Sequence, residues 1–455
     1  TQKSRVEYAA LGGRINADFI DNAGGVNSSD VEVNIKIAMT DIMHNPVNKM
    51  DLQKRNALLA KMTEEVAGLV LRNSYQQAQG ISLMALQAPQ TLITDAQFIR
   101  VLERDQGLKR KLENLPDEKE IERRRAAGLG LYRPELCIVQ SYAKIAYTSE
   151  LLNSDIPDQP EMQDFLITYF PKPMQEKYKN DLLGHQLGRE IIAMRIANSI
   201  VNRMGAAFIK ARMDATGASC ADVVRAFLVV REAFGLRDFW DRIEALDGKA
   251  SAMAQLRAMM DLQETAERAI TWFLTRLGRT PNLAKDIPAF REQVDKLRAG
   301  ADGALPAGLK AVVARRLKDA IENGLPEKLA RDLSLLPVLD SAFDIIRISA
   351  ERKGNIAATA KAYFRVGEYF HVDSLRAGAE AIPAADRWAQ EARSGLIEQL
   401  YGVQAALALQ HLNEPEETAE AQGVKALIES ILNTGSIDAP RLMIAIQRLQ
   451  QLAAK

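Results

Sequence analysis

The stretch Asp21–Glu32, DNAGGVNSSDVE, decides the fold at the start of the chain. Just before it, Arg14 to Ile20 (RINADFI) alternates apolar and polar residues with the period of a β-strand. After it, from about Asp30, apolar residues recur with helical spacing as far as His44. The order strand, glycine turn and helix predicts an α/β crossover at this end of the chain.

The glycine turn and the helix start allow a functional interpretation and a purely structural one. Gly24 and Gly25 permit a positive φ, or a close approach of the backbone to a bound group. Ser29-x-x-Glu32 matches a capping box, which places the helix start near Asp30. Any α/β crossover contains these parts, so the pattern alone does not identify a ligand site. Asp30 and Glu32 also place two negative charges in the first turn, which counts against a phosphate there.

The composition is typical of a soluble globular protein. The chain has 455 residues, of which 47% are apolar and 26% charged, a length that suggests roughly two to three domains. Basic and acidic residues number 59 each, so the zero net charge does not indicate nucleic acid or an anionic membrane as a partner. Because no run of 18 apolar residues occurs, we expect no membrane-spanning helix. The first residues lack the apolar core of a signal peptide and an initiator Met, which fits a fragment.

Cysteine and histidine are too sparse for a metal site built on them. Cys137 and Cys220 are the only cysteines, so no CxxC motif exists. Two cysteines in a chain of this length favour a reducing compartment and hence the cytoplasm, although one disulfide between them remains possible. The histidines form no HxxxH pair: His44, His185, His371 and His411.

Beyond Leu52 the apolar residues follow helical spacing, and no convincing strand pattern appears. Gly, Pro, Asn or Asp marks most of the joints between the predicted helices. Helices are predicted at Thr1–Leu11, Asp30–His44, Asp51–Leu86 with a possible break at Gly80, Thr94–Asp105, Asp117–Ala127, Pro134–Leu152, Gln186–Arg203, Ser219–Phe234, Lys249–Leu277, Ala307–Asn323, Pro326–Glu351, Asn355–Phe370, Ala384–Leu412, Glu416–Leu432 and Ala439–Ala453.

Short loops between helices predict an irregular helical bundle or stacked helical hairpins. Gly300, Gly303 and Pro306 cluster among small residues, so a boundary within the helical region is predicted between Asn282 and Pro306. The helical region is thereby divided into 46–281 and 282–455.

Two further motifs look functional but have plainer explanations. The basic run that ends at Arg125 invites a phosphate interpretation, but Asp117, Glu118 and Glu120 lie just upstream and favour a salt-bridged, solvated helix face. Gly128-x-Gly130 has no third glycine at the required spacing and follows no strand, so it is not a dinucleotide fingerprint.

Several long segments resemble one enzyme family, the large NAD-specific bacterial glutamate dehydrogenases. The run TQKSRVEYAALGGRINADFIDNAGGVNSSDVEVNIKI resembles the end of the family's dinucleotide-binding domain, and Asn22–Val26 matches its Asn-Ala-Gly-Gly-Val turn. Family segments similar to RNALLAKMTEEVAGLVLRNSYQQ, RAAGLGLYRPELCIVQSYAKI, HQLGREIIAMRIANSIVNRMG and TGASCADVVRAFLVVREAFGL follow in the same order. The chain thus resembles the last third or so of such a protein, with residues 1–45 as the C-terminal edge of the Rossmann-like domain.

The resemblance implies a reaction, a cofactor and a few site residues. The family oxidises L-glutamate to 2-oxoglutarate and ammonia with hydride transfer to NAD, and the nicotinamide carries the redox chemistry. The matched turn implies that Asn22, Gly24 and Gly25 lie at the cofactor. It also implies that Val26 and Ser29 face the substrate side chain. The family's catalytic lysine and aspartate lie upstream of this turn, so no catalytic residue is assigned here.

Each implied site residue also has a structural explanation. Asn22 could satisfy backbone groups of the turn, and Ser29 is already explained as a helix cap. After Val26 the sequence departs from the small glutamate dehydrogenases, because Asn27 to Asp30 replace a more apolar run. Asp18 and Asp21 are interpreted as turn formers.

Two functions from different classes therefore remain open. In the first, the chain is the C-terminal part of an NAD-dependent glutamate dehydrogenase. Its helical region then serves regulation or the assembly of a homo-oligomer, and the chain alone is inactive. In the second, the helices form an interaction scaffold for protein partners without a catalytic role.

Overall fold

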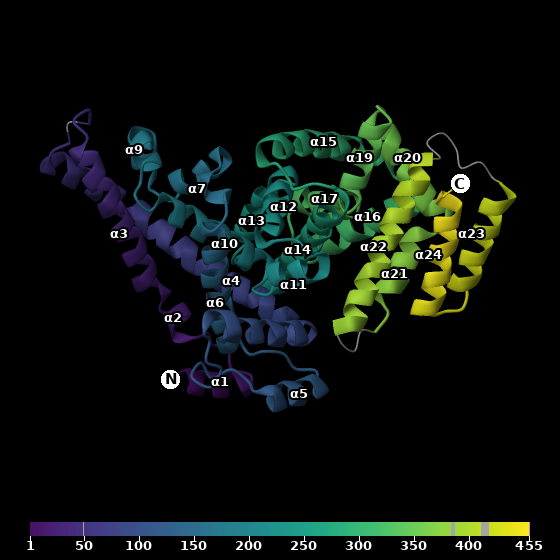
Figure 1. Ribbon diagram of the computed structural model, residues 1–455, viewed down its shortest axis with the longest axis horizontal. Helices are drawn as coiled ribbons and strands as arrows, with labels where there is room; N and C mark the ends of the chain where they lie inside the picture. Colours follow the sequence, from purple (N-terminus) through teal and green to yellow (C-terminus); the bar gives the residue numbers. More distant parts are fainter. Residues whose placement is uncertain (49, 384–386, 411–417, 455) are drawn as a thin grey trace. The chain divides into compact units, whose positions relative to one another are not determined.

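The computed structural model describes residues 1–48, 50–383, 387–410 and 418–454, and within them every regular element is a helix (Figure 1). The predominantly α-helical fold is therefore confirmed. No helix in these ranges has the length and apolar character that crossing a bilayer requires. The chain divides into two compact units, Thr1–Arg225 and Ala226–Lys455. The domain boundaries placed after residues 45 and 281 stay predictions.

The first unit is built around three long helices that pack on one another: α4, α6 and α10. The apolar residues of α10 face this core, because Ile192, Ile196 and Ile200 are all buried. The helices of this unit are α1 (Gln2–Ala10), α2 (Asp18–Asp21), α3 (Ala23–His44), α4 (Leu52–Gln106), α5 (Glu118–Ala126), α6 (Arg133–Leu152), η1 (Ile156–Asp158), η2 (Pro160–Met162), α7 (Gln163–Ile167), α8 (Lys172–Lys177), α9 (Lys179–Leu183), α10 (Gly188–Met204), α11 (Phe208–Thr216) and α12 (Cys220–Ala233), which continues into the second unit.

Helix α4 is longer than predicted. It begins after Asp51, whose carboxylate accepts from the Lys54 amide at 2.8 Å, and it ends at Gly107 in the left-handed conformation. The predicted interruption at Pro89 is wrong, because the helix continues through that residue. The possible break at Gly80 is absent too: this glycine lies where α10 crosses closely, and an added Cβ would lie 2.9 Å from the Asn202 carbonyl oxygen.

The predicted strand at Arg14 to Ile20 is wrong. Its second half is helix α2, and no strand among the described residues is there to pair with it. The buried residues are Ala17 and Ile20, three apart as on a helix, whereas Phe19 remains 41% exposed. A period of two over one short segment therefore did not identify the face that is buried.

The predicted glycine turn and capping box are also wrong. Helix α3 begins at Ala23, so Gly24 and Gly25 are helical residues without a positive φ. Ser29 lies inside the helix, where the backbone amides already have helical partners, and it caps nothing. The predicted end of this helix at His44 is confirmed.

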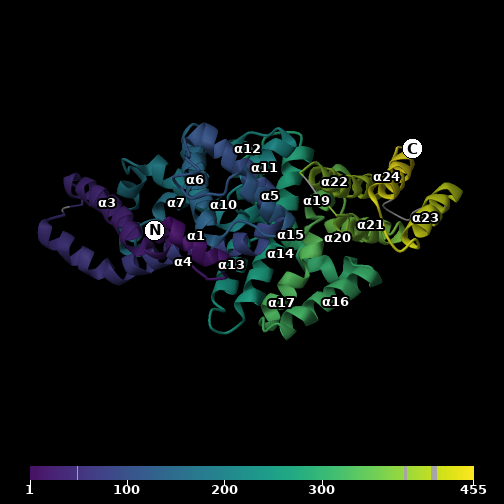
Figure 2. The same ribbon diagram turned by 90° about the horizontal axis from the view of Figure 1, so that it is seen from below.

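The second unit packs its helices around an aromatic cluster. Rings of Phe234, Trp272, Phe273, Phe290 and Phe343 meet with centroids 4.8–6.3 Å apart. The remaining helices are α13 (Leu236–Glu244), α14 (Ala252–Arg276), α15 (Leu283–Ala304), α16 (Ala307–Glu322), α17 (Glu327–Ser334), α18 (Leu336–Leu339), α19 (Ala342–Glu351), α20 (Ile356–Tyr369), α21 (Val372–Glu380), α22 (Arg387–Gln410), α23 (Ala419–Leu432) and α24 (Ala439–Ala453). Helices α16 and α17 pack side by side as a hairpin (Figure 2).

One predicted helix in this unit is wrong, and two helices, α15 and α21, were not predicted. The small-residue stretch from Asn282 to Pro306 is mostly helix α15, capped by Asn282. The single helix predicted over Pro326–Glu351 is three helices, α17, α18 and α19. Helix α21 was not predicted. The predicted helix starts at Ala384 and Glu416 and the predicted end at Leu412 lie outside the described residues.

Candidate functional site

The implied cofactor and substrate residues lie together at the start of helix α3. Asn22 precedes the helix, and Gly25, Val26 and Ser29 follow at spacings of three, four and seven, so these four share one helix face. All four are exposed, and Val26 is 67% exposed. Gly24 is exposed as well but points to another side of the helix. The residues thus form one accessible edge on the opposite side from the buried face of α3.

The surface of this edge is open. The side-chain amide of Asn22 makes no hydrogen bond to the described residues and does not cap the helix. Cβ atoms added at Gly24 and Gly25 would meet no atom within 4 Å, so the space beside the backbone is open. Among the described residues no group of three or more His, Cys, Asp or Glu side chains could hold a metal ion.

An ion-pair cluster holds the segment before α3. The Arg5 guanidinium donates to Asp18 at 2.7 Å, to Asp21 at 2.8 Å and to the Asn16 carbonyl at 3.0 Å. The Asn16 side chain in turn donates to Asp21 and accepts from Arg133, at 2.9 and 3.0 Å. Burial lowers the pKa of Arg133. Asp18 and Asp21 are therefore ion-pair partners of Arg5, and both lie in helix α2, so their interpretation as turn formers is wrong.

Both cysteines are buried free thiols. The Cys137 thiol lies 3.3 Å from the Ala17 amide, which donates to it, and burial raises the pKa of this thiol to about 12. Burial raises the pKa of Cys220 to about 12 as well. Both are free thiols, so the possible disulfide between them is absent. A buried thiol with a raised pKa carries little thiolate and is a poor nucleophile.

Four residues that hold the edge were not singled out from the sequence: Arg133, Cys137, Tyr169 and His185. They contact the segment 16–34 from positions 117 to 151 residues further along the chain. No local pattern could reveal contacts at such separations. The only available signal was that Arg133 and Cys137 lie in RAAGLGLYRPELCIVQSYAKI, and His185 begins HQLGREIIAMRIANSIVNRMG.

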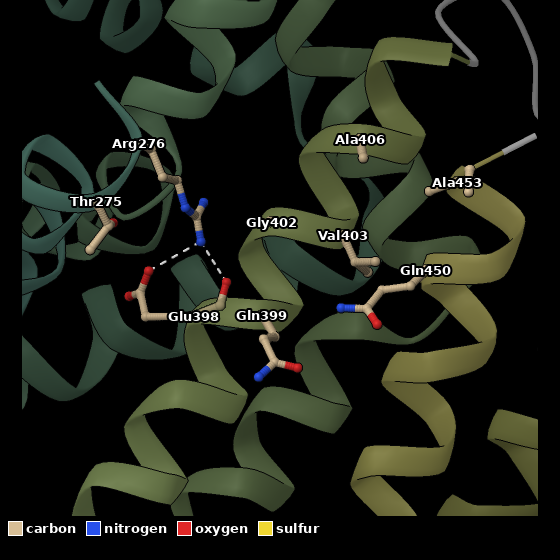
Figure 3. A pocket seen from close by; sticks show the side chains of 10 residues that line it. Thr275, Arg276, Glu398, Gln399, Gly402, Val403, Ala406, Gln450 and Ala453 are labelled. Carbon is tan, nitrogen blue, oxygen red and sulfur yellow. Dashed lines mark hydrogen bonds and ion pairs between the residues drawn. The ribbon is translucent and has the colours of Figure 1, made fainter. Parts of the chain in front are cut away.

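A separate cavity of about 560 Å³ lies in the second unit (Figure 3). Its lining includes small residues of α22, of α24 and of the position just after α24: Gly402, Ala406, Ala453 and Ala454. Arg276 at its edge donates to Asp344 at 2.8 Å and to Glu398 at 3.1 Å, so its charge is already neutralised. A second cavity of about 540 Å³ lies between α14 and α16, where Arg316 pairs with Asp261 at 2.7 Å. Neither cavity contains a residue of the predicted site.

Comparison with known proteins shows that two families match this chain, each over a different part of it. The family "Glutamate dehydrogenase, C-terminal" matches residues 128–453. The family "Bacterial NAD-glutamate dehydrogenase, catalytic domain" matches residues 1–84, which include the exposed edge of α3.

Three curated relatives carry the name NAD-specific glutamate dehydrogenase. The protein of Halomonas elongata is 33% identical over 471 residues, which cover 100% of this chain. That of Pseudomonas aeruginosa is 35% identical over 93% of this chain, and that of Mycobacterium tuberculosis is 30% identical over 99%. The chain spans only 29%, 26% and 28% of these relatives, respectively. The chain therefore belongs to the glutamate dehydrogenase family and corresponds to its C-terminal part.

Proposed function

We propose that this chain is the C-terminal part of an NAD-dependent glutamate dehydrogenase. The whole enzyme converts L-glutamate, NAD and water to 2-oxoglutarate, ammonia and NADH. The observation that carries the proposal is the exposed edge Asn22–Ser29, which lies inside the segment matched by the catalytic-domain family. The scaffold alternative loses its main support, because that match makes the N-terminal segment part of an enzyme domain.

The residues of the edge would bind and orient. The free amide of Asn22 would donate and accept hydrogen bonds at the carboxamide end of the cofactor. Gly24 and Gly25 leave space for the ring beside the backbone. Val26 and Ser29 share a face with Asn22 and would contact the substrate side chain. Bound NAD supplies the hydride acceptor. The groups that move the proton belong to the rest of the catalytic domain.

The helical region would serve regulation or the assembly of a homo-oligomer. Its extent supports this role, because the C-terminal family match covers residues 128–453 and contains neither the glycine loop nor the catalytic lysine of the family. We place the enzyme in the cytoplasm, since both cysteines are free and buried.

The test is NADH formation from glutamate and NAD by the gene product that contains this chain. Asn22→Ala should lower kcat/KM on the order of tenfold or more, because cofactor orientation contributes strongly to rate. Asn433→Ala is the matched control: Asn433 is an exposed asparagine after helix α23 and should leave kcat/KM unchanged. An active gene product with an unaffected Asn22→Ala variant would remove Asn22 from the site, and an inactive gene product would contradict the function.

A further inference from the structure

Helix α3 is attached to the helical region by apolar packing and by hydrogen bonds from Tyr169 and His185, which together form a polar seam. The Tyr169 hydroxyl donates to Asp30 Oδ2 at 2.9 Å and accepts from Asn34 Nδ2 at 2.9 Å. Tyr169 and Asn34 are each only 6% exposed. One phenol therefore links two successive turns of α3 from the loop after helix α7.

His185 adds a second contact to the same turn. Its Nε2 lies 3.1 Å from the Asn34 carbonyl oxygen, and the Leu187 amide donates to its Nδ1 at 3.1 Å. Because Nδ1 accepts, the ring proton lies on Nε2 and is donated to the Asn34 carbonyl. The ring is 5% exposed and packs against Phe170, with centroids 5.4 Å apart. The Leu187 amide and the Phe170 ring thus fix the orientation in which His185 contacts α3.

The hydrogen bonds of the seam fix the rotation and the axial position of α3, which apolar packing alone leaves free. The buried apolar face of α3 includes Val31, Ile35 and Ala38, and such contacts are non-directional. The hydrogen bonds of Tyr169 and His185 are directional, so they set the rotation of α3 about its axis and its position along that axis. Residues 22 and 30 are eight apart, which is about 12 Å along a helix. Because α3 is continuous, a rotation of the helix at Asp30 also rotates the exposed edge.

We propose that Tyr169 and His185 are positioning residues for the cofactor edge, an inference that rests on the proposed function. Both lie in the segment matched by the C-terminal family, whereas α3 lies in the segment matched by the catalytic domain. The helical region thereby acts on the reaction through the rotation of α3, which sets where Asn22 and Ser29 face. Loss of the seam leaves the fold intact and lets α3 turn.

Hydrogen exchange on this 455-residue chain tests the seam without any activity. Tyr169→Phe keeps the ring and removes both hydroxyl bonds, and it should speed exchange of the α3 amides about three- to tenfold. Tyr142→Phe is the control, because the Tyr142 hydroxyl also donates to a carboxylate, Glu113 at 3.0 Å, but does not contact α3. Equal exchange of α3 in the two variants would overturn the proposal.

Kinetics of the gene product test the consequence for the reaction. Tyr169→Phe should raise KM for NAD or lower kcat about three- to tenfold, whereas Tyr142→Phe should match the wild type. His185→Ala should act similarly, and His185→Gln, whose amide nitrogen can replace Nε2 as donor, should restore most of the loss. Wild-type kinetics for Tyr169→Phe in an active enzyme would overturn the proposal. If the gene product lacks glutamate oxidation, the proposed function falls and exchange alone decides the seam.

Discussion

At the scale of single residues, Lys144 on helix α6 is the least satisfied charge in the first unit. Its Nζ is buried and has no hydrogen-bond partner among the described residues, and burial lowers its pKa from 10.5 to about 7. Between about pH 7 and 10.5, Lys144 therefore carries its proton in the unfolded chain but not in the folded chain. The contribution of Lys144 to stability therefore rises with pH across this window, and the full cost of burying its charge is present below about pH 7.

We predict that Lys144→Met stabilises the first unit at pH 6 by about 3 kcal/mol and has little effect at pH 10. Methionine keeps most of the aliphatic volume and removes the charge. Urea denaturation at pH 6, 8 and 10, for the wild type and the variant, measures the difference. A stability difference between the wild type and the variant that does not shrink from pH 6 to pH 10 would show that the ammonium is solvated in the folded chain.

The basic run on helix α5 illustrates which residue-scale features the sequence reveals. Ion pairing was predicted and is confirmed: Arg123 pairs with Glu120, and Arg125 with Glu122, at 2.7 and 2.9 Å. The sequence did not reveal that Arg124 is buried against Glu135 at 2.6 Å. Neighbouring arginines look alike in a sequence, and only the packing of α5 on the rest of the unit decides which one is enclosed.

At the scale of elements, long helices with strong periodicity were predictable, and α6, α10, α14, α20 and α24 are confirmed. The failures have physical causes. Pro89 does not end α4, since a single lost backbone hydrogen bond is offset by tertiary packing: Ala88 and Leu92 on either side are buried. The segment before α3 looked like a strand, but nothing among the described residues pairs with it, and Arg5 and Cys137 satisfy its polar groups instead.

The two glycines of α4 give an element-scale prediction. Gly80 lies at the crossing with α10, where a Cβ would come 2.9 Å from the Asn202 carbonyl oxygen, whereas a Cβ at Gly68 would meet nothing within 4 Å. Gly80→Ala should therefore destabilise by about 1–3 kcal/mol through overpacking. Gly68→Ala should stabilise by up to about 1 kcal/mol through helix propensity. Thermal unfolding of both variants provides the measurement, and a Gly80→Ala variant as stable as Gly68→Ala would contradict the close crossing.

At the scale of the whole molecule, the resemblance predicted more than the local patterns did. The turn predicted at Gly24 and Gly25 is wrong, because both residues lie in helix α3. The resemblance of the same segment to glutamate dehydrogenases is supported, because the catalytic-domain family matches residues 1–84. A family match adds up similarity over many positions. It therefore does not depend on the secondary structure that is predicted for any single segment. The geometry of the edge could not be predicted, because it depends on Arg133, Tyr169 and His185, which only the fold brings to segment 16–34.

We expect the isolated chain to be inactive. Around the exposed edge, Asp18 and Asp21 are paired with Arg5, and Cys137 is held as a thiol, so no described group there is poised to take a proton. NADH formation from glutamate should therefore be undetectable for the 455-residue chain under conditions where the gene product turns over. A rate above background that Asn22→Ala abolishes would contradict this prediction, since catalysis would then arise from this edge and groups within the chain itself.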